Sequence, residues 1–210
     1  MKIAIIKYNA GNVQSVTYAL QRLGIEPVLT DDEQEIRSAD RVIFPGVGEA
    51  STAMYYLRKK GLDKLIPTLE QPVLGVCLGL QLMCRFSDEN NTECLNIFDL
   101  TVKRFDSSKA RTAGGESLKI PHMGWNTLSD YKSALLKGLS ANAYVYYVHS
   151  YYAPLSEYTI ATTHYIDPFS AMLHKDNFYA CQFHPEKSQS VGLRILRNFA
   201  HGAVPATAPH

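Results

Sequence analysis

A cysteine flanked by two glycines stands at residues 75–79, between an apolar run and a helix-compatible stretch. Val73 and Leu74 precede the motif, and residues 82–86 follow it. Glycines occur on both sides of such a position because a sharp strand-to-helix turn leaves no room for side chains beside the projecting residue. The unpaired N–H groups and the positive end of the following helix favour a thiolate over a thiol. The segment therefore predicts a strand, a tight turn and a helix, with Cys77 as a candidate nucleophile.

A cysteine at such a turn can also be a buried structural residue. A second motif helps to separate this alternative from a nucleophile. The strand-like run 178–183 ends at His184-Pro185-Glu186. In an extended segment, residues two apart point to the same side, so His184 and Glu186 can face one site. A thiol nucleophile needs a base, and the base needs a carboxylate that orients it. We therefore expect Cys77, His184 and Glu186 to form a catalytic triad.

Strand and helix patterns alternate through the first half of the chain, which is typical of a mostly parallel sheet covered on both faces. We expect strands at 2–8, 27–29 and 41–44, and helices at 13–23, about 49–60 and 191–199. From about residue 95, tyrosine-rich and β-branched runs favour antiparallel strands at 101–105, 144–152 and 159–165. Residues 107–117 are the best candidate for a mobile loop, and residues 202–210 for a flexible tail.

Composition excludes several other classes of protein. The formal charge of +1, with both signs interspersed, gives no basic surface for nucleic acid or an anionic membrane. The four cysteines show neither C-x-x-C pairs nor the density of a small secreted scaffold. The apolar start at residues 1–7 is too short for a signal peptide or a membrane span. These features favour a reduced, cytoplasmic location.

The two motifs G-x-C-x-G-x-Q, at 75–81, and H-P-E, at 184–186, resemble those of the class I, triad-type glutamine amidotransferases. Further segments look like the glutaminase subunits of imidazole glycerol phosphate synthases, and they lie at 8–12, 45–48, 121–126 and 147–152. Together these segments span nearly the whole chain. Lys7 departs from the resemblance, because an acidic residue is expected before the 8–12 motif.

This resemblance implies a three-layer α/β fold, with a mostly parallel central sheet flanked by helices and with antiparallel strands in the second half. Residues 1–201 would form a single amidotransferase domain. The implied activity is hydrolysis of L-glutamine to L-glutamate and ammonia, without a cofactor or a metal. The implied partner is a HisF-type cyclase, a (β/α)8 barrel that forms a heterodimer with this chain. The cyclase would use the ammonia to make imidazole glycerol phosphate and AICAR from PRFAR in histidine biosynthesis.

Three alternatives remain open at this point. The ammonia could serve another acceptor synthase, in anthranilate, GMP, carbamoyl phosphate or sugar amidation chemistry, although the 8–12 and 121–126 motifs speak against this. The chain could be a cysteine hydrolase that works without a partner. It could also bind a metal through Cys77, Cys181, His184 and Glu186, but these residues lack the paired spacing of structural zinc sites.

The expected reaction needs an oxyanion hole and a glutamine pocket. Leu78 N–H, at the helix start, is one candidate oxyanion donor. The resemblance implies a second donor in the Gly46–Val47 peptide, which we expect to be misoriented at rest and to flip in the active enzyme. Gln81 lies one helical turn after Cys77 and can reach the pocket. By resemblance, the α-amino and α-carboxylate groups of glutamine would be bound by Glu89 and by the segment His149, Ser150 and Tyr151.

Candidate partner contacts combine the resemblance with the preference of Trp and Met for interfaces. They are Asn12, Met123, Trp125, Tyr146 and Lys187. The alternative for Trp125 is core packing, and its exposure in the free chain would separate the two.

Overall fold

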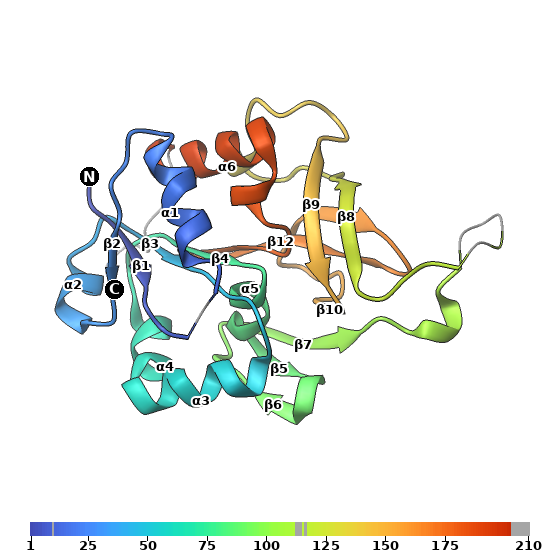
Figure 1. The fold of residues 1–210 in the computed structure, drawn as a ribbon, viewed down its shortest axis with the longest axis horizontal. Helices are drawn as coiled ribbons and strands as arrows, with labels where there is room; N and C mark the ends of the chain where they lie inside the picture. The colour runs from blue at the N-terminus through green and yellow to red at the C-terminus, as the bar shows by residue number, and fades with distance from the viewer. Residues whose placement is uncertain (10, 112–114, 116, 203–210) are drawn as a thin grey trace.

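The computed structural model describes residues 1–9, 11–111, 115 and 117–202. Within these residues, a seven-stranded sheet forms the centre of the fold (Figure 1). In spatial order its strands are β11 (Thr159–His164), β12 (Pro168–Lys175), β13 (Phe178–Cys181), β4 (Val73–Val76), β3 (Arg41–Phe44), β1 (Ile3–Ile6) and β2 (Val28–Thr30). The five strands from β13 to β2 are parallel, whereas β11 and β12 add an antiparallel edge.

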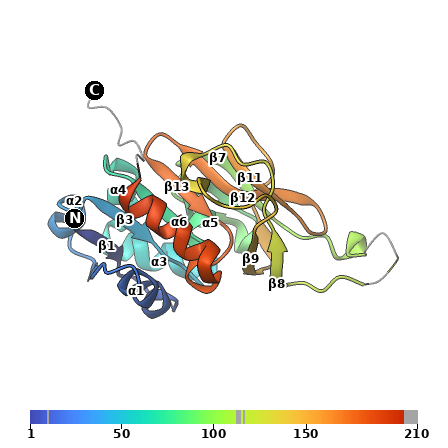
Figure 2. The same cartoon turned by 90° about the horizontal axis from the view of Figure 1, so that it is seen from above.

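Helices cover both faces of this sheet. Successive side chains of β1 point to opposite faces and are all apolar, so both faces need a cover. Ile3 and Ile5 pack into one core with α1 (Val13–Gln21) and α6 (Gln189–His201). Ala4 and Ile6 point the other way. The second core also contains residues of α2 (Glu33–Arg37), α3 (Ala50–Lys60), α4 (Leu62–Leu65) and α5 (Leu78–Met83). Figure 2 shows α1 and α6 together over the near face of the sheet.

Two smaller sheets lie beside the central one. One contains β10 (Tyr151–Tyr152), β7 (Phe98–Arg104), β5 (Cys84–Ser87) and β6 (Thr92–Glu93). The other is an antiparallel pair of β8 (His122–Thr127) and β9 (Tyr144–His149). As Figure 1 shows, β8 and β9 stand side by side next to the central sheet. β9 contacts the turn Pro185–Lys187 that follows β13, and β8 contacts β11.

The predicted three-layer fold is confirmed, with differences in detail. The helix-compatible stretch 82–86 is divided, because α5 ends at Met83 and β5 begins at Cys84. Residues 101–104 of the predicted strand 101–105 belong to β7, which pairs parallel with β5 as well as antiparallel with β10. The strands β8 and β12 and the short helix α2 were not predicted. The predicted mobile loop falls partly on residues 112–114 and 116, and the predicted tail falls on 203–210, all outside the described residues.

Within the described part of the chain, no helix combines the length and the apolarity needed to cross a membrane.

Candidate active site

Three adjacent parallel strands deliver the predicted site residues to one edge of the central sheet. β4 ends immediately before Cys77, and its neighbour β13 is in register with it, with Cys181 opposite Val76. β13 then leads to His184, and the other neighbour of β4, β3, leads to residues 45–48. Ligand sites of open parallel sheets lie at the carboxyl ends of the strands. The topology thus brings together three segments that are distant in sequence.

Cys77 has an unusual backbone conformation of the kind found in tight turns. Its φ is 55° and its ψ is −106°, and α5 starts at the next residue. A non-glycine residue with positive φ is uncommon and is often found at functional sites. The flanking glycines are needed for space, since a Cβ on Gly79 would lie 2.1 Å from the carbonyl oxygen of Phe44. On Gly75 it would lie 2.8 Å from the sulfur of Met83. The predicted sharp turn is confirmed.

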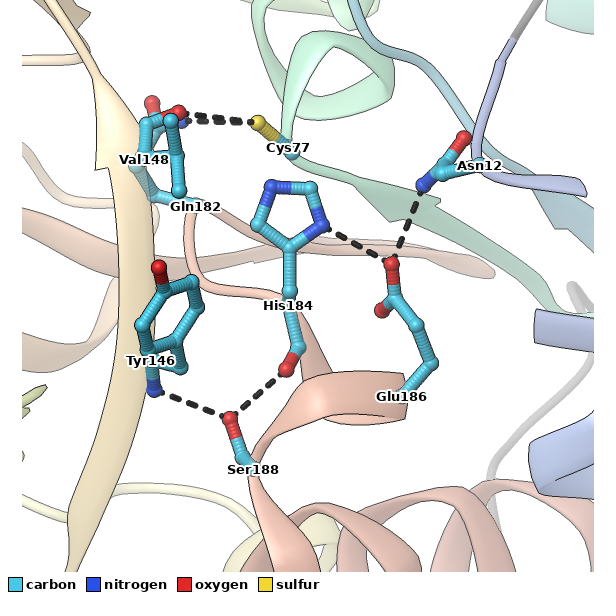
Figure 3. A network of polar contacts seen from close by, with 8 residues as sticks. All are labelled: Asn12, Cys77, Tyr146, Val148, Gln182, His184, Glu186 and Ser188. Carbon is cyan, nitrogen blue, oxygen red and sulfur yellow. Dashed lines mark hydrogen bonds and ion pairs between the residues drawn. The ribbon is translucent and has the colours of Figure 1, made fainter. Parts of the chain in front are cut away.

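The side chains of Cys77, His184 and Glu186 lie together at this edge of the sheet. In Figure 3 the imidazole of His184 lies between the Cys77 sulfur and the Glu186 carboxylate. Nδ1 of His184 donates to Glu186 Oε1 at 2.8 Å, and the opposite side of the ring faces the Cys77 sulfur. Burial disfavours the cationic form of the ring, but the Cys77 sulfur and the Glu186 carboxylate outweigh burial and raise the pKa of His184 to about 10. The arrangement suits a base that takes the thiol proton.

The buried side chain of Ser188 fixes the backbone of the turn that carries His184. The Ser188 hydroxyl donates to the carbonyl oxygen of His184 at 2.6 Å and accepts from the backbone N–H of Tyr146 at 2.9 Å. The backbone N–H of His184 donates to the carbonyl oxygen of Tyr146 at 2.9 Å. β9 and the turn that follows β13 are therefore tied together at the histidine (Figure 3).

The Cys77 sulfur has two further polar neighbours. It lies 3.8 Å from the carbonyl oxygen of Val148 and 3.8 Å from Nε2 of Gln182, which is fully buried. Oε1 of Gln182 accepts from Nε2 of Gln81 at 3.1 Å. Gln81 also donates to the carbonyl oxygen of Tyr151 at 2.9 Å. The predicted pocket residue Gln81 thus connects Gln182, which lies next to the Cys77 sulfur, with the 149–151 segment.

The candidate oxyanion hole is closed in this structure. Leu78 N–H donates to the carbonyl oxygen of Gly46 at 3.2 Å. The Gly46–Val47 peptide therefore turns its carbonyl, rather than its N–H, towards the start of α5. The segment 45–48 is also held by Tyr8, whose hydroxyl donates to the carbonyl oxygen of Pro45 at 2.6 Å.

A cavity of about 360 Å³ opens over the sulfur. Its wall contains Cys77 and His184 together with most of the predicted oxyanion and glutamine residues, which are Val47, Leu78, Gln81, Glu89, His149, Ser150 and Tyr151. Glu89 reaches the cavity from the loop after β5, and its Oε2 accepts from the backbone N–H of Ala50 at 2.7 Å. Burial raises the pKa of Glu89, against the lowering effect of that N–H. Among the residues that the structure describes, no group of three His, Cys, Asp or Glu side chains could hold a metal.

The predicted interface residues separate into exposed and buried ones. Met123 and Trp125 are 62% and 46% exposed, so Trp125 is not part of the core. Tyr146 packs edge-on against Trp125 with the ring centres 5.8 Å apart, and Lys187 lines the cavity. Asn12 differs from the expectation: it is 4% exposed, and its Nδ2 donates to Glu186 Oε1 at 3.2 Å. Its side chain serves the triad from within and presents no surface to a partner.

Comparison with known proteins gives the same family for nearly the whole chain. A family model described as glutamine amidotransferase class-I matches residues 4–203. The imidazole glycerol phosphate synthase subunit HisH of Bacteroides fragilis is 60% identical over 199 residues, which is 95% of this chain and 98% of that protein. The protein of the same name from Shewanella oneidensis is 44% identical, over 94% of each chain. The chain belongs to the HisH family of class-I glutamine amidotransferases.

Solved structures agree with this family at the level of the fold. A crystal structure described as that of a putative GMP synthase component from Thermoplasma acidophilum has a TM-score of 0.70 to this HisH-family chain. The sequence identity is 20%, and the match covers 95% of this chain and 92% of the other. The HisH-family chain therefore has the fold of a class I glutamine amidotransferase.

Sequence reasoning missed three contacts in this HisH-family site. Gln182 and Ser188 stand two positions before and two positions after the H-P-E segment, and both are completely buried, which no local sequence pattern shows. Asn12 was singled out, but for a surface role. The other three thiols of this glutamine amidotransferase are not nucleophile candidates, because burial raises the pKa of Cys84 and Cys181, and that of Cys94 to about 12.

Proposed function

We propose that Cys77, His184 and Glu186 hydrolyse the side-chain amide of L-glutamine, and that the chain passes the ammonia to a HisF-type cyclase in a cytoplasmic heterodimer. The cyclase uses this ammonia to make imidazole glycerol phosphate and AICAR from PRFAR in histidine biosynthesis. The observation that carries the proposal is that Cys77 and His184 share the wall of one cavity, while Glu186 accepts a hydrogen bond from His184 behind that wall.

The chemistry follows from these contacts. His184 takes the thiol proton, and the Cys77 sulfur attacks the amide carbon of glutamine. The imidazolium then protonates the departing nitrogen, which leaves as ammonia, and a thioester remains on Cys77. A water molecule, deprotonated by His184, hydrolyses the thioester to glutamate and restores the thiol. Glu186 holds the ring in the tautomer and orientation that these transfers require.

Substrate recognition uses the rest of the cavity wall. The Glu89 carboxylate is suited to the α-ammonium of glutamine, and the segment from His149 to Tyr151 is suited to its α-carboxylate. The oxyanion would be met by Leu78 N–H and by Val47 N–H, so the Gly46–Val47 peptide must rotate out of its contact with Leu78. A partner that docks near this edge of the sheet could favour the rotated peptide, which would couple hydrolysis to the presence of the acceptor.

The surface beside the site supports a protein partner. Met123 and Trp125 project from β8 into solvent, and large exposed apolar side chains of this kind mark interaction surfaces. Free ammonia is mostly protonated at neutral pH and is then no longer a nucleophile, so hydrolysis is useful only when an acceptor enzyme lies close by.

The decisive experiment separates hydrolysis from synthesis. In the complex with a HisF cyclase, Cys77→Ala should abolish glutamine-dependent synthesis and leave synthesis from ammonium salts intact. Cys94→Ala is the matched control, because Cys94 lies outside the cavity wall, and it should retain glutamine-dependent synthesis. Glutamine hydrolysis by Cys77→Ala would overturn the mechanism.

The acceptor is tested separately. Glutamine hydrolysis should rise when a HisF cyclase is added. A chain that hydrolyses glutamine but responds instead to an anthranilate, GMP or sugar-amidating synthase would keep the triad and refute the proposed partner.

A further inference from the structure

Two buried histidines that take no part in the triad form a hydrogen-bonded pair beside the cavity. Nδ1 of His122, on β8, lies 3.0 Å from Nε2 of His149, on β9. The two residues are 3% and 5% exposed. A pair of this kind needs one ring nitrogen to carry a proton and the other to be bare. Which nitrogen carries the proton is settled by the neighbours at the two ends of the pair.

At one end, His149 meets a backbone carbonyl. Its Nδ1 lies 2.8 Å from the carbonyl oxygen of Tyr151, and a carbonyl oxygen can only accept. Nδ1 of His149 therefore carries the proton, and Nε2 of the neutral ring is bare. The bare nitrogen must accept from His122, so the proton of His122 is also on Nδ1.

At the other end, an amide of fixed orientation gives the same answer. Oδ1 of Asn126 accepts from the N–H of Thr127 at 2.8 Å, and Nδ2 donates to the carbonyl oxygen of His164 at 2.8 Å. These backbone partners determine which end of the amide is nitrogen. Nδ2 also lies 3.3 Å from Nε2 of His122. Nε2 of His122 therefore accepts, and the proton of His122 is on Nδ1, as the opposite end requires.

The environment keeps both rings neutral and in place. Burial lowers the pKa of His122 to about 4 and that of His149 to about 3, although the hydrogen bond to the Tyr151 carbonyl acts in the opposite direction on His149. His122 is stacked between two tyrosines, with ring centres 4.8 Å from Tyr147 and 3.9 Å from Tyr165. The ring therefore has a fixed plane as well as a fixed tautomer.

The series of hydrogen bonds from His122 through His149 ends at the carbonyl oxygen of Tyr151, in the cavity wall. Gln81 also donates to this oxygen. Tyr151 O accepts from Nδ1 of His149 at 2.8 Å and from Nε2 of Gln81 at 2.9 Å. The preceding carbonyl, that of Ser150, accepts from the backbone N–H of Phe105 at 3.1 Å. The carbonyl groups of Ser150 and Tyr151 are thus both held by hydrogen bonds.

We propose that His122 is a positioning residue for glutamine binding: it donates to His149, which fixes the Tyr151 carbonyl and so holds the Ser150–Tyr151 wall in the shape that receives the substrate. This inference rests on the proposed glutaminase function. It assigns His122 to the binding of glutamine rather than to the bond-breaking step, because its contacts lead to the cavity wall and not to the Cys77 sulfur.

The first test is spectroscopic and needs no activity. In the 15N-histidine-labelled chain at neutral pH, long-range 1H–15N correlations should show His122 and His149 both neutral and both protonated at Nδ1. The His122→Asn and His149→Asn spectra assign the two rings. A cationic ring, or an Nε2-protonated tautomer at either position, would overturn the proposal.

The second test separates binding from turnover in the complex with the cyclase. His122→Leu leaves Nε2 of His149 without a donor, and we expect the KM for glutamine to rise about tenfold while kcat stays within about twofold. His122→Asn places an amide N–H near the position of Nδ1 and should return KM to within about twofold of the parent value. Synthesis from ammonium salts should be unchanged in both.

The outcomes distinguish this inference from the proposed function. His164→Leu is the matched control, since that exposed residue joins the network only through its backbone carbonyl. If the parent chain hydrolyses no glutamine, the proposed function fails. If the parent chain is active and His122→Leu keeps the parent KM, or lowers kcat alone, the positioning role is wrong. If His122→Leu does not fold, the positioning role is judged from the NMR tautomers of the parent chain and from the KM of His122→Asn.

Discussion

Asn12 and Glu186 lie 174 residues apart in the sequence and share a buried hydrogen bond of 3.2 Å. The same Glu186 oxygen, Oε1, accepts a hydrogen bond from His184 Nδ1, while the other oxygen, Oε2, is buried and has no partner among the residues that the structure describes. Among the described residues, the Glu186 carboxylate thus has two hydrogen-bond donors, and Asn12 is one of them.

We therefore expect Asn12→Asp to be more damaging than Asn12→Ala. Removal of the amide costs Glu186 a charge-assisted hydrogen bond of about 1.5–3 kcal/mol. The aspartate would in addition place a second carboxylate against Glu186 in a buried site. Steady-state kinetics should show kcat for glutamine hydrolysis reduced by about tenfold or more for Asn12→Asp. Gln14→Ala, on an exposed position of the same helix, is the control. Equal activity of Asn12→Asp and the parent would contradict this role.

Gly46 should tolerate no side chain. A Cβ there would lie 2.6 Å from the Tyr8 hydroxyl, 2.8 Å from Cβ of Leu78 and 2.9 Å from the backbone nitrogen of Gly79. Overpacking of this kind costs about 1–3 kcal/mol, and it would also obstruct rotation of the Gly46–Val47 peptide. Urea unfolding and glutaminase assays should show both losses for Gly46→Ala. Gly138→Ala, at a φ of 81° and away from the cavity wall, should lose stability but keep the kinetics of the folded fraction.

Gln182 should affect the reactivity of the sulfur more than the fold of the site. Its amide is held by Gln81 and points Nε2 at Cys77 from 3.8 Å, so it favours a negative sulfur. Gln182→Glu reverses the polarity at nearly constant volume. We expect alkylation of Cys77 by iodoacetamide to slow by about tenfold in this variant, because the thiolate is the reacting form. An unchanged alkylation rate would show that the contact is without consequence.

The buried histidine pair should weaken the fold in acid. The pKa of His122 is lowered by burial from 6.5 to about 4, and that of His149 to about 3. From pH 6.5 down to these values, the unfolded chain binds protons that the folded chain does not. The free energy of unfolding therefore falls as the pH falls through this window. His184 acts in the opposite direction: its raised pKa contributes stability below 6.5 that is lost as the pH rises through about 10.

Urea unfolding between about pH 5 and about pH 8 measures this dependence. His122→Asn removes one of the two titrating groups. Below pH 6.5, the slope of the free energy of unfolding against pH should therefore be smaller in this variant than in the parent, by up to about 1.4 kcal/mol per pH unit. The same slope in the variant and the parent would show that His122 titrates normally in the folded chain.

The sequence was sufficient for the five parallel strands of the central sheet and for bringing Cys77 and His184 to one edge of it, because each depends on a local pattern. The glycines around Cys77 and the position of His184 at a strand end report on a turn and on strand direction, and both are properties of a few adjacent residues. The bond from Asn12 to Glu186 is different: it depends on the register of distant strands, and no local pattern contains it.

The strand β8 escaped prediction for another physical reason. It buries His122 and exposes Met123 and Trp125, so its polar and apolar positions are reversed relative to a strand that packs on an apolar core. Such a pattern indicates an internal polar network on one side and an external contact on the other. Only the neighbouring strand β9, with His149 opposite His122, makes this visible.

The four thiols of this chain differ sharply in their surroundings. Burial raises the pKa values of Cys84, Cys94 and Cys181, while Cys77 lines the open cavity. At neutral pH a haloacetamide dye should therefore label one sulfur per folded molecule. The labelled fraction counts competent sites directly, so preparations of different quality can be placed on a common turnover scale before their rates are compared.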